Sequence, residues 1–305
     1  MTSSSARGGL AYGVAAYLIW GAFPLYWPLL EPSGPVEILA HRVLWSVLVM
    51  LALVALTRRT AQLRALAADR RTRSLLALAA LTITSNWAMY IYGVNSGRVV
   101  ETSLGYFINP LVTVLMGVVV LRERLRPAQW AALGVGGLAV VVLTVDYGRP
   151  PWIALVLAFS FGTYGLAKKA AGVEPVESLT FETLLIAPFA AVFLLALTLR
   201  GDGTAFDHGL DHALLLPTTG LVTAIPLILF GAAAVRVSMV NLGLLQYLAP
   251  VLQFLLGLTV FDETMTTGRW IGFTLVWAAL VIFTLEALRH HRRALQVSAE
   301  ASLAV

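Results

Sequence analysis

Ionisable side chains interrupt several long apolar runs of this chain, and they are the residues most able to do chemistry. Glu101 lies in RVVETSLGYF, Arg42 in ILAHRVLWS and Glu182 in SLTFETLLI. A charge at the centre of a bilayer costs about 3 kcal/mol or more, so such a residue generally faces other helices or a polar passage. If these runs lie in lipid, the side chains predict binding of a solute or a proton within the membrane.

Glu101 begins a series of residues at helical spacing. Gly105 and Asn109 follow at i+4 and i+8, so the three share one face of an α-helix. We expect this face to line a cavity. The alternative is that Glu101 is a carboxylate at the membrane interface, stabilised by the dipole at the start of its helix.

Arg42 and Glu182 occupy equivalent positions in the two halves of an internally repeated chain. They are predicted to meet across a pseudo-twofold axis and to form a gate or an ion site. The alternative is that each side chain extends separately toward a membrane surface. His41, beside Arg42, titrates near neutral pH when it is unperturbed, which makes it a candidate proton carrier.

Amide and aromatic side chains add further candidates for a substrate path. Buried amides in a bilayer often hydrogen-bond neighbouring helices instead of ligands, so both interpretations stay open for this set. The set consists of Trp20, Asn86, Trp87, Tyr90, Asn95, Tyr106, Tyr164, Gln246, Tyr247 and Gln253.

Two prolines lie inside apolar runs, at Pro110 and Pro250, and glycines accompany them at Gly105 and Gly243. A proline within a helix removes one backbone hydrogen bond. Helix breaks at matching places in two halves of a transporter indicate the transport path. These four residues are therefore predicted to act in helix breaking and gating, with a fixed kink that only improves packing as the alternative.

The composition requires a bilayer. Of 305 residues, 59% are hydrophobic and 12% are charged, whereas soluble domains carry about 25% charged residues. The apolar runs are continuous, which indicates helices and not a β-barrel. The chain has no cysteine, which excludes thiol chemistry and Cys-based metal sites. The DHGLDH stretch is expected to be a solvated loop, and no metal or other cofactor is predicted.

The hydropathy pattern predicts an all-α membrane protein with ten transmembrane helices, because each span needs roughly 20 apolar residues. Pro24 and Pro28 predict a kink or a broken end in the first span. The ten spans are about Leu10–Leu29, Val36–Leu56, Ser74–Val94, Val99–Leu121, Pro127–Val145, Trp152–Lys168, Glu177–Leu199, Ala213–Val235, Val240–Phe261 and Gly268–Leu288.

The chain also contains an internal repeat. At one constant offset, Pro110 matches Pro250, Gly117 matches Gly257, Glu123 matches Glu263 and Trp130 matches Trp270. Repetition of this kind strongly constrains the fold. Each repeat holds five helices, an odd number, so the second repeat is expected to cross the membrane in the opposite direction. The predicted units are residues 8–146, residues 150–288 and a cytoplasmic tail of residues 289–305.

Basic residues predict the orientation. With the N-terminus inside, 16 of the 21 Lys and Arg residues fall in cytoplasmic segments and 4 on the other face, while Arg42 lies within a span. Positive charge concentrates on the cytoplasmic side of membrane proteins. We expect a multi-pass protein of a bacterial-type plasma membrane with both termini in the cytoplasm.

Three stretches carry a family resemblance: YLIWGAFPLYWPLL, the run from NWAMYIYGVN to VVVLRERL, and VSMVNLGLLQYLAPVLQFLLGLTVFDET. They resemble the RarD branch of the EamA transporters, in the drug/metabolite transporter superfamily. The resemblance covers nearly the whole chain. It implies a ten-helix export-type permease in which two inverted five-helix repeats surround a central cavity, and it implies no particular substrate.

The function expected from these observations is a secondary permease. It would export a small organic metabolite, an amino acid-like compound or a drug by alternating access, with protons as a possible coupling partner. No GxxxxGK[ST] motif is present, which argues against ATP hydrolysis. An uncoupled facilitator, a lipid scramblase or sensor, and an intramembrane enzyme are the alternatives. The partners expected are the solute and the bilayer, with no nucleic acid, and the sequence does not predict an oligomeric state.

Overall fold

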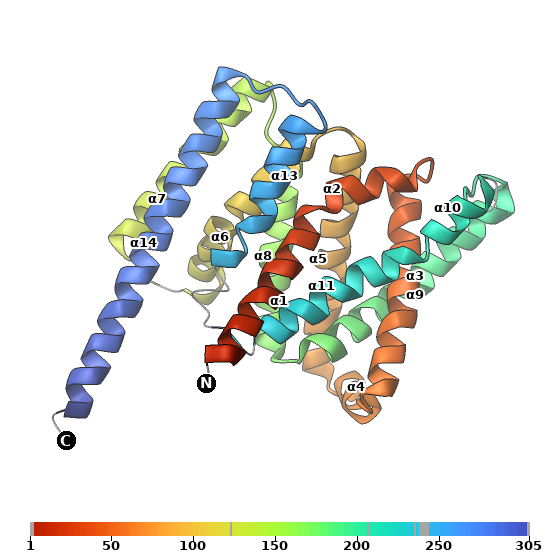
Figure 1. The fold of residues 1–305 in the computed structure, drawn as a ribbon, viewed down its shortest axis with the longest axis horizontal. Coiled ribbons are helices and arrows are strands. Elements are labelled where there is room, and N and C mark those ends of the chain that lie inside the picture. Colours follow the sequence, from red (N-terminus) through yellow and green to blue (C-terminus); the bar gives the residue numbers. More distant parts are fainter. Residues whose placement is uncertain (1–2, 123, 206–207, 235, 238–243, 304–305) are drawn as a thin grey trace.

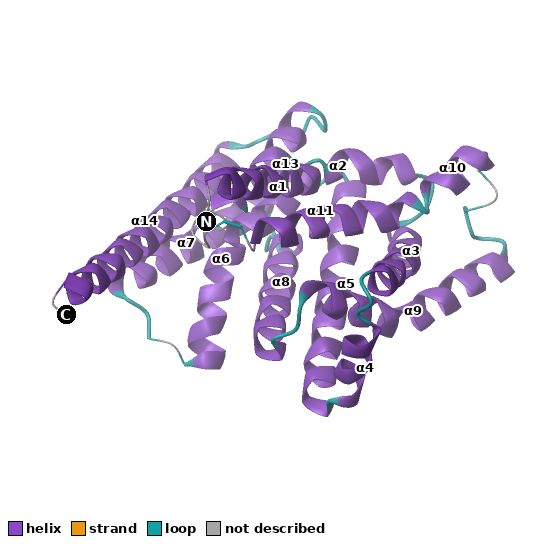
Figure 2. Ribbon diagram, turned by 60° about the horizontal axis from the view of Figure 1, so that its bottom comes forward, coloured by secondary structure: helices purple, strands orange, loops and turns teal. Residues whose placement is uncertain are grey.

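The computed structural model describes all residues except 1–2, 123, 206–207, 235, 238–243 and 304–305. Every regular element in the described part of the chain is a helix, joined by short loops (Figure 2). This agrees with the continuous apolar runs of the sequence, since a backbone in lipid must satisfy its hydrogen bonds within each segment.

The first half of the chain forms seven α-helices and one 3₁₀-helix (Figure 1). They are α1 (Ser3–Gly21), α2 (Phe23–Tyr26), η1 (Trp27–Leu30), α3 (Pro35–Leu56), α4 (Thr60–Ala68), α5 (Arg70–Asn95), α6 (Val99–Leu121) and α7 (Pro127–Tyr147). The second half contributes α8 (Trp152–Ala171), α9 (Pro175–Arg200), α10 (Gly209–Leu215), α11 (Thr218–Ala234), α13 (Leu248–Thr259) and α14 (Thr267–Leu303).

Among the described residues, seven helices are long and apolar enough to cross a membrane, or eight if the bent pair at the N-terminus counts as one span. The predicted multi-pass membrane protein is thereby supported, whereas the predicted number of ten spans is not reached. The helix α8 ends in two lysines, and the described part of the ninth predicted span, α13, has only 12 residues.

The structure differs from the predicted spans in three places. The basic loop after α3 contains the additional short helix α4. The eighth predicted span begins as α10, and Pro217 separates that short helix from α11. The last helix, α14, is 37 residues long and extends past the predicted end of its span into the predicted tail. Sequence hydropathy did not indicate α4 or the extension of α14, because both lie in polar segments.

The prolines act differently in the two halves. The predicted kink near Pro24 is confirmed, since the helix axis bends by 45° between Gly8–Gly21 and Phe23–Leu30. Pro110 lies inside α6, which continues through it. Pro250 is the third residue of α13, where the missing N–H would have had no helical partner. Matching breaks at Pro110 and Pro250 are therefore not the arrangement in the structure.

Helices from the two halves of the chain pack against each other. Figure 1 shows α7 beside α14 at one edge and α3 beside α9 at the other. Between these pairs, α8 packs against α5 and α6, and α11 packs against α1 and α3. The largest apolar core among the described residues joins α6, α7, α8, α13 and α14, and it includes Phe107, Phe254 and Phe273. The two halves thus share one interior.

Gly105 permits the closest approach of α6 to α8. A Cβ atom added there would lie 2.8 Å from the Leu157 Cβ and 2.9 Å from the Ala154 carbonyl oxygen. We expect Gly105→Ala to lower the free energy of unfolding by about 1–3 kcal/mol, because neither neighbour is the end of a flexible side chain. Gly165→Ala is the matched control, since no atom lies within 4 Å of its added Cβ. Thermal unfolding in detergent tests both, and equal stability of the two variants would contradict the expectation.

Candidate functional site

Arg42 on α3 is buried, with 4% of its surface exposed. Its Nε donates a hydrogen bond to the Thr223 hydroxyl on α11 at 2.9 Å. Aromatic rings surround the guanidinium, whose carbon lies 4.0 Å from the centre of Trp87, 5.0 Å from Trp27 and 5.9 Å from Phe23. The negative faces of such rings stabilise a cation. The residues around this charge come from the bent part of the first span (α2 and η1), from α5 and from α11, while Arg42 itself lies on α3.

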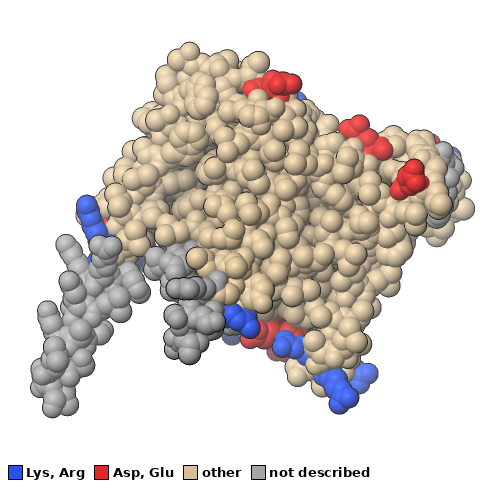
Figure 3. All heavy atoms as spheres, in the orientation of Figure 1, with Lys and Arg blue, Asp and Glu red and all other residues tan. Residues whose placement is uncertain are grey.

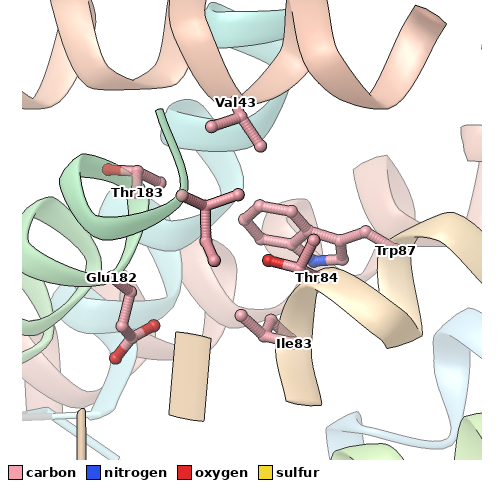
Figure 4. A pocket seen from close by; sticks show the side chains of 7 residues that line it. Val43, Ile83, Thr84, Trp87, Glu182 and Thr183 are labelled. Carbon is pink, nitrogen blue, oxygen red and sulfur yellow. The ribbon is translucent and has the colours of Figure 1, made fainter. Parts of the chain in front are cut away.

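Trp87 also lines a narrow crevice. The lining residues come from α3, α5 and α9 and are Val43, Ile83, Thr84, Trp87, Glu182, Thr183 and Ile186. Figure 4 shows the Trp87 ring between Val43 and Ile83, with Glu182 at the far end of the lining. The side chains pack so closely that the crevice has no room for a water-sized molecule.

Glu182 and Arg42 do not pair with each other, which corrects the predicted contact. The Glu182 carboxylate accepts hydrogen bonds from Lys168 Nζ at 3.0 Å and from the Ser178 hydroxyl at 2.5 Å. Lys168 also donates to Ser178. The cause is proximity along the chain, because Glu182 and Ser178 are one helical turn apart on α9, and α8 ends beside them. Glu182 is 1% exposed, so a buried ion pair forms here within the second half.

Glu101 makes the contacts of a helix-start carboxylate. Its two oxygens accept hydrogen bonds from Arg149 at 3.2 and 2.8 Å, and one of them also accepts the Ile153 N–H at the start of α8. Glu101 itself lies in the first turn of α6. These contacts join the N-terminal ends of α6 and α8, as in the interfacial alternative. Gly105, on the same face, packs on α8 and does not face an open cavity.

The buried amides join helices to one another. Asn86 on α5 donates to the Leu157 carbonyl and the Ser160 hydroxyl of α8, and it accepts from Tyr106 on α6. Gln253 on α13 donates to the Trp20 carbonyl at 3.1 Å. Both are nearly fully buried. Asn86 and Gln253 thus bond neighbouring helices, which is the alternative to substrate contact given by the sequence analysis.

The other candidate residues are divided between the core and the edges of the bundle. Tyr90 packs edge-to-face on Tyr106, and Tyr164 lies 5.4 Å from the Lys168 ammonium. The oxygens of Asn95 and Asn109 are buried without a described hydrogen-bond partner. His41, Gln246 and Tyr247 are half-buried. Gly243 lies outside the described residues.

The sequence did not indicate several partners of the buried charges, among them Trp27, Lys168, Arg149 and Thr223. Lys168 is the last residue of a predicted span, and Arg149 lies between two predicted spans. Trp27 and Thr223 differ in no obvious way from other residues of their spans. The only sequence signal for a partner was the constant repeat offset, which pairs Arg42 with Glu182. The offset identifies equivalent positions in the two halves, and equivalent positions need not be in contact.

The carboxylates Glu37 and Glu177 close opposite ends of the α3–α9 pair. Glu37 accepts the Thr204 N–H, after α9, at 2.8 Å, and Glu177 accepts from Arg59, after α3, at 2.9 Å. We name these the α10 end and the α4 end, after the short helix beside each. Both carboxylates are buried, with 5% and 4% exposed. The two closures are equivalent, because Glu37 and Glu177 are related by the same repeat offset as Pro110 and Pro250.

The DHGLDH stretch does not form a metal site in the described residues, among which no group of three metal-binding side chains comes together. Asp207 lies outside them. His212 is buried at the α10 end, where its Nε2 lies 2.9 Å from the Ser33 hydroxyl and 3.3 Å from that of Thr204. This part of the stretch is thus packed against the start of α3 and is not the solvated loop expected.

Glu263, between α13 and α14, fixes that connection to α6. Its Oε1 accepts the Val100 N–H at 3.0 Å. Burial raises the pKa of this carboxyl from 4.5 to about 7, and nearby Glu101 adds to the rise. A raised carboxyl pKa means that the folded state favours the neutral form, so its contribution to stability is lost as the pH rises through about 7.

We expect the protein to lose on the order of 1 kcal/mol of stability between pH 6 and pH 8 through Glu263, after allowance for its partial exposure. Glu263→Gln retains an acceptor for Val100 and does not ionise. Thermal unfolding of both proteins at a series of pH values measures the difference. An unchanged pH dependence in the variant would show that Glu263 does not carry the effect.

The sequence profile of the EamA-like transporter family matches the chain twice, over residues 7–145 and 150–285. The chain belongs to the EamA-like transporter family. The two matched segments together cover most of the chain, and they divide between α7 and α8.

Relatives within this family are similar over nearly their full length. The chain is 56% identical to Protein RarD of Streptomyces exfoliatus, covering 94% of this chain and 91% of the relative. It is 38% identical to Protein RarD of Escherichia coli K12, covering 96% and 99%, and 38% identical to the uncharacterized transporter YojE of Bacillus subtilis 168, covering 96% and 98%. The predicted resemblance to the RarD branch is confirmed.

A solved structure with 21% sequence identity has the same fold. It is described as "Crystal structure of protein", and it superposes with a TM-score of 0.58 over 94% of this chain and 99% of that chain. The family and its relatives identify the chain as a membrane transporter, and they specify neither substrate nor coupling.

Proposed function

We propose that this protein is a secondary permease that moves a small organic metabolite by alternating access between two inverted five-helix repeats. In this proposal α1 with α2 and η1, α3, α5, α6 and α7 are the five spans of the first repeat. The five spans of the second are α8, α9, α11, the segment that includes α13, and α14. The observation that carries the proposal is the pair of buried charge sites, at Arg42 and Glu182, on the facing helices α3 and α9.

Reciprocal contacts between α7 and α14 support the inverted repeat. Asp146, at the end of α7, binds Thr266 and Arg269 at the start of α14, while Glu286 in α14 binds Arg126 just before α7. The repeat offset relates Asp146 to Glu286, and it relates Arg126 to Thr266. When residue A of one repeat contacts residue B of the other, a twofold axis requires the counterpart of A to contact the counterpart of B. The two contacts above satisfy this condition.

The α3–α9 pair supports the same relation, since Glu37 and Glu177 each bind the segment that follows the other helix. Two helices related in this way run antiparallel, as neighbours from oppositely oriented repeats must. The duplicate match of the family profile is consistent with this arrangement.

The distribution of charge supports an orientation with both termini in the cytoplasm. Figure 3 shows mostly Lys and Arg along the lower edge, where α4 lies, with one acidic patch beside them, and separate patches of Asp and Glu along the upper edge. By the positive-inside rule the α4 end faces the cytoplasm and the α10 end faces outward. We propose a bacterial-type plasma membrane as the site of action.

Reconstitution in liposomes tests the proposal. A water-soluble metabolite extract is sealed inside proteoliposomes, and mass spectrometry identifies solutes that appear outside faster than in protein-free liposomes. The expected result is saturable efflux of a small number of solutes, faster under an imposed pH gradient if protons are coupled. Efflux that ignores the gradient supports a facilitator, and lipid exchange between leaflets without solute flux supports a scramblase.

A reversible lock tests whether solute movement requires the α10 end to open. The Ser33 and Thr204 hydroxyl oxygens lie 2.5 Å apart at the α10 end, and the chain has no cysteine of its own. Oxidation of the Ser33→Cys, Thr204→Cys double variant is expected to stop efflux, and reduction to restore it. Each single-cysteine variant is the control and is expected to be insensitive to oxidation. Undiminished efflux from the fully cross-linked variant would contradict an opening of this end.

A further inference from the structure

Hydrogen-bond donors without acceptors cluster around Arg42. The structure gives its guanidinium one hydrogen-bond acceptor among the described residues, at Nε, through Thr223. Trp27 Nε1, the Tyr90 hydroxyl and the Ser46 hydroxyl are buried without any described partner. Trp27 and Ser46 have no exposed surface and Tyr90 only 3%. Leaving a buried polar group unpaired costs about 1–3 kcal/mol, so a cluster of such groups in one place requires an explanation.

These groups belong to one neighbourhood. The Trp27 ring lies 5.0 Å from the Arg42 guanidinium. Tyr90 belongs to the same buried cluster as Phe23 and Trp27, two of the rings around Arg42. Ser46 follows Arg42 by one turn of α3, on the same side of that helix. Three helical segments, η1, α3 and α5, therefore present donors to a common region.

The positive charge also lacks an anion. No described carboxylate lies within 4.0 Å of Arg42, although Glu101, Glu177 and Glu182 each have a basic partner within that distance. Burying a lone charge in lipid is costly unless it is paired. Cation–π contacts reduce this cost by about 2 kcal/mol or somewhat more, which leaves a site suited to a negative group.

We propose that Arg42 binds the carboxylate of an organic monoanion, the substrate class of the permease, and that the aromatic rings around it hold the apolar part of that molecule. This inference rests on the proposed function. A guanidinium binds a carboxylate through two parallel hydrogen bonds. The two terminal nitrogens of Arg42 can supply these bonds, while Trp27, Tyr90 and Ser46 supply further donors.

One positive charge selects for one negative charge. A dianion such as a phosphate monoester would bring a second charge into the same buried region, where the observed contacts of the guanidinium are one hydroxyl and three aromatic rings. These rings belong to Phe23, Trp27 and Trp87. Flat apolar groups pack well on such rings. The favoured solute therefore carries one carboxylate on a flat, apolar or aromatic body.

Binding to the purified full-length protein in lipid nanodiscs tests this inference without a transport assay. The probes are benzoate, phenylacetate and indole-3-acetate, each compared with its neutral primary amide. Thermal unfolding is followed at increasing probe concentrations, because a ligand of the folded state raises the unfolding temperature. We expect at least one carboxylate to bind tenfold or more tightly than its amide.

Variants locate the site. Arg42→Gln is expected to abolish the preference for carboxylate over amide, and Trp27→Phe, which keeps a ring and removes the donor, to weaken carboxylate binding about threefold to tenfold. Arg124→Gln removes an exposed arginine and is expected to bind as the unaltered protein does. If Arg42→Gln does not fold, Trp27→Phe decides the matter by the same measurement.

Two results would overturn the inference: no carboxylate binds better than its amide, or the preference survives in Arg42→Gln and in Trp27→Phe. A failure of the proposed permease function gives a different pattern of results from a failure of this inference. A protein that binds carboxylates at Arg42 and moves no solute in liposomes would contradict the permease, whereas solute efflux without carboxylate binding would contradict only this inference.

Discussion

Glu182→Leu is expected to lower the free energy of unfolding by about 3–5 kcal/mol. The substitution leaves Lys168 buried beside α9 without its carboxylate, and an uncompensated buried charge is strongly destabilising. Lys168 is 19% exposed and Glu182 is 1% exposed at the side chain, so water replaces little of the lost interaction. The Ser178 hydroxyl, which bridges the pair, does not neutralise the ammonium.

Unfolding in a mild detergent with increasing denaturant measures this loss. The double variant Lys168→Met, Glu182→Leu removes both charges and is expected to recover most of the stability, because a buried ion pair often contributes little relative to apolar residues of similar size. Lys169→Met, at an exposed position next along α8, is the control. If the double variant is as unstable as Glu182→Leu, the loss comes from packing and not from the orphaned charge.

Glu177→Gln is expected to favour opening of the α4 end about tenfold, and Glu37→Gln to favour opening of the α10 end by a similar factor. Each glutamine weakens one charge-assisted hydrogen bond, which is worth about 1.5–3 kcal/mol, and about 1.4 kcal/mol corresponds to a tenfold change. The Arg59 side chain is 41% exposed, so water weakens its bond to Glu177. The energy lost in Glu177→Gln is therefore expected near the lower end of the range of about 1.5–3 kcal/mol. Because the two carboxylates close opposite ends of the α3–α9 pair, the two substitutions are expected to open opposite ends.

Accessibility of a single cysteine separates these effects. Thr84→Cys places a thiol in the crevice lined by Trp87 and Glu182, and a membrane-impermeant maleimide is added from one side of the membrane or the other. Faster labelling from the cytoplasmic side is expected with Glu177→Gln, and from the opposite side with Glu37→Gln. Glu174→Gln, at an exposed residue one position before α9, is the control. Acceleration from the same side in both variants would contradict the gating assignment.

The sequence predicts those parts of the fold that depend on one segment alone, such as a helix or a bend. Continuous apolar runs predict helices such as α3 and α9, and the structure has these helices within two residues of the predicted starts, at Pro35 and Pro175. A proline pair predicted the bend near Pro24. These features depend on local backbone chemistry and on the thickness of a bilayer. Pro250 shows the limit of such reasoning, since its effect depends on where α13 begins.

The site was predictable only as a set of unusual residues. Arg42, Glu101 and Glu182 stand out because charge is rare in apolar runs, and all three are buried, with 4%, 2% and 1% exposed. Their partners did not follow from the sequence. Arg42 meets aromatic rings from η1 and α5, Glu101 meets Arg149, and Glu182 meets Lys168.

The sequence by itself determined that this chain enters a membrane, that its second half repeats its first at one constant offset, and which polar groups must be hidden from lipid. Hydrophobicity and repetition are properties of residues in order along the chain, so no fold is needed to detect them. The tertiary structure decided which hidden charges are neutralised within the protein and which one, Arg42, keeps donors without an anion. That choice depends on which helices pack side by side, and packing joins residues far apart in the chain at distances of a few ångströms.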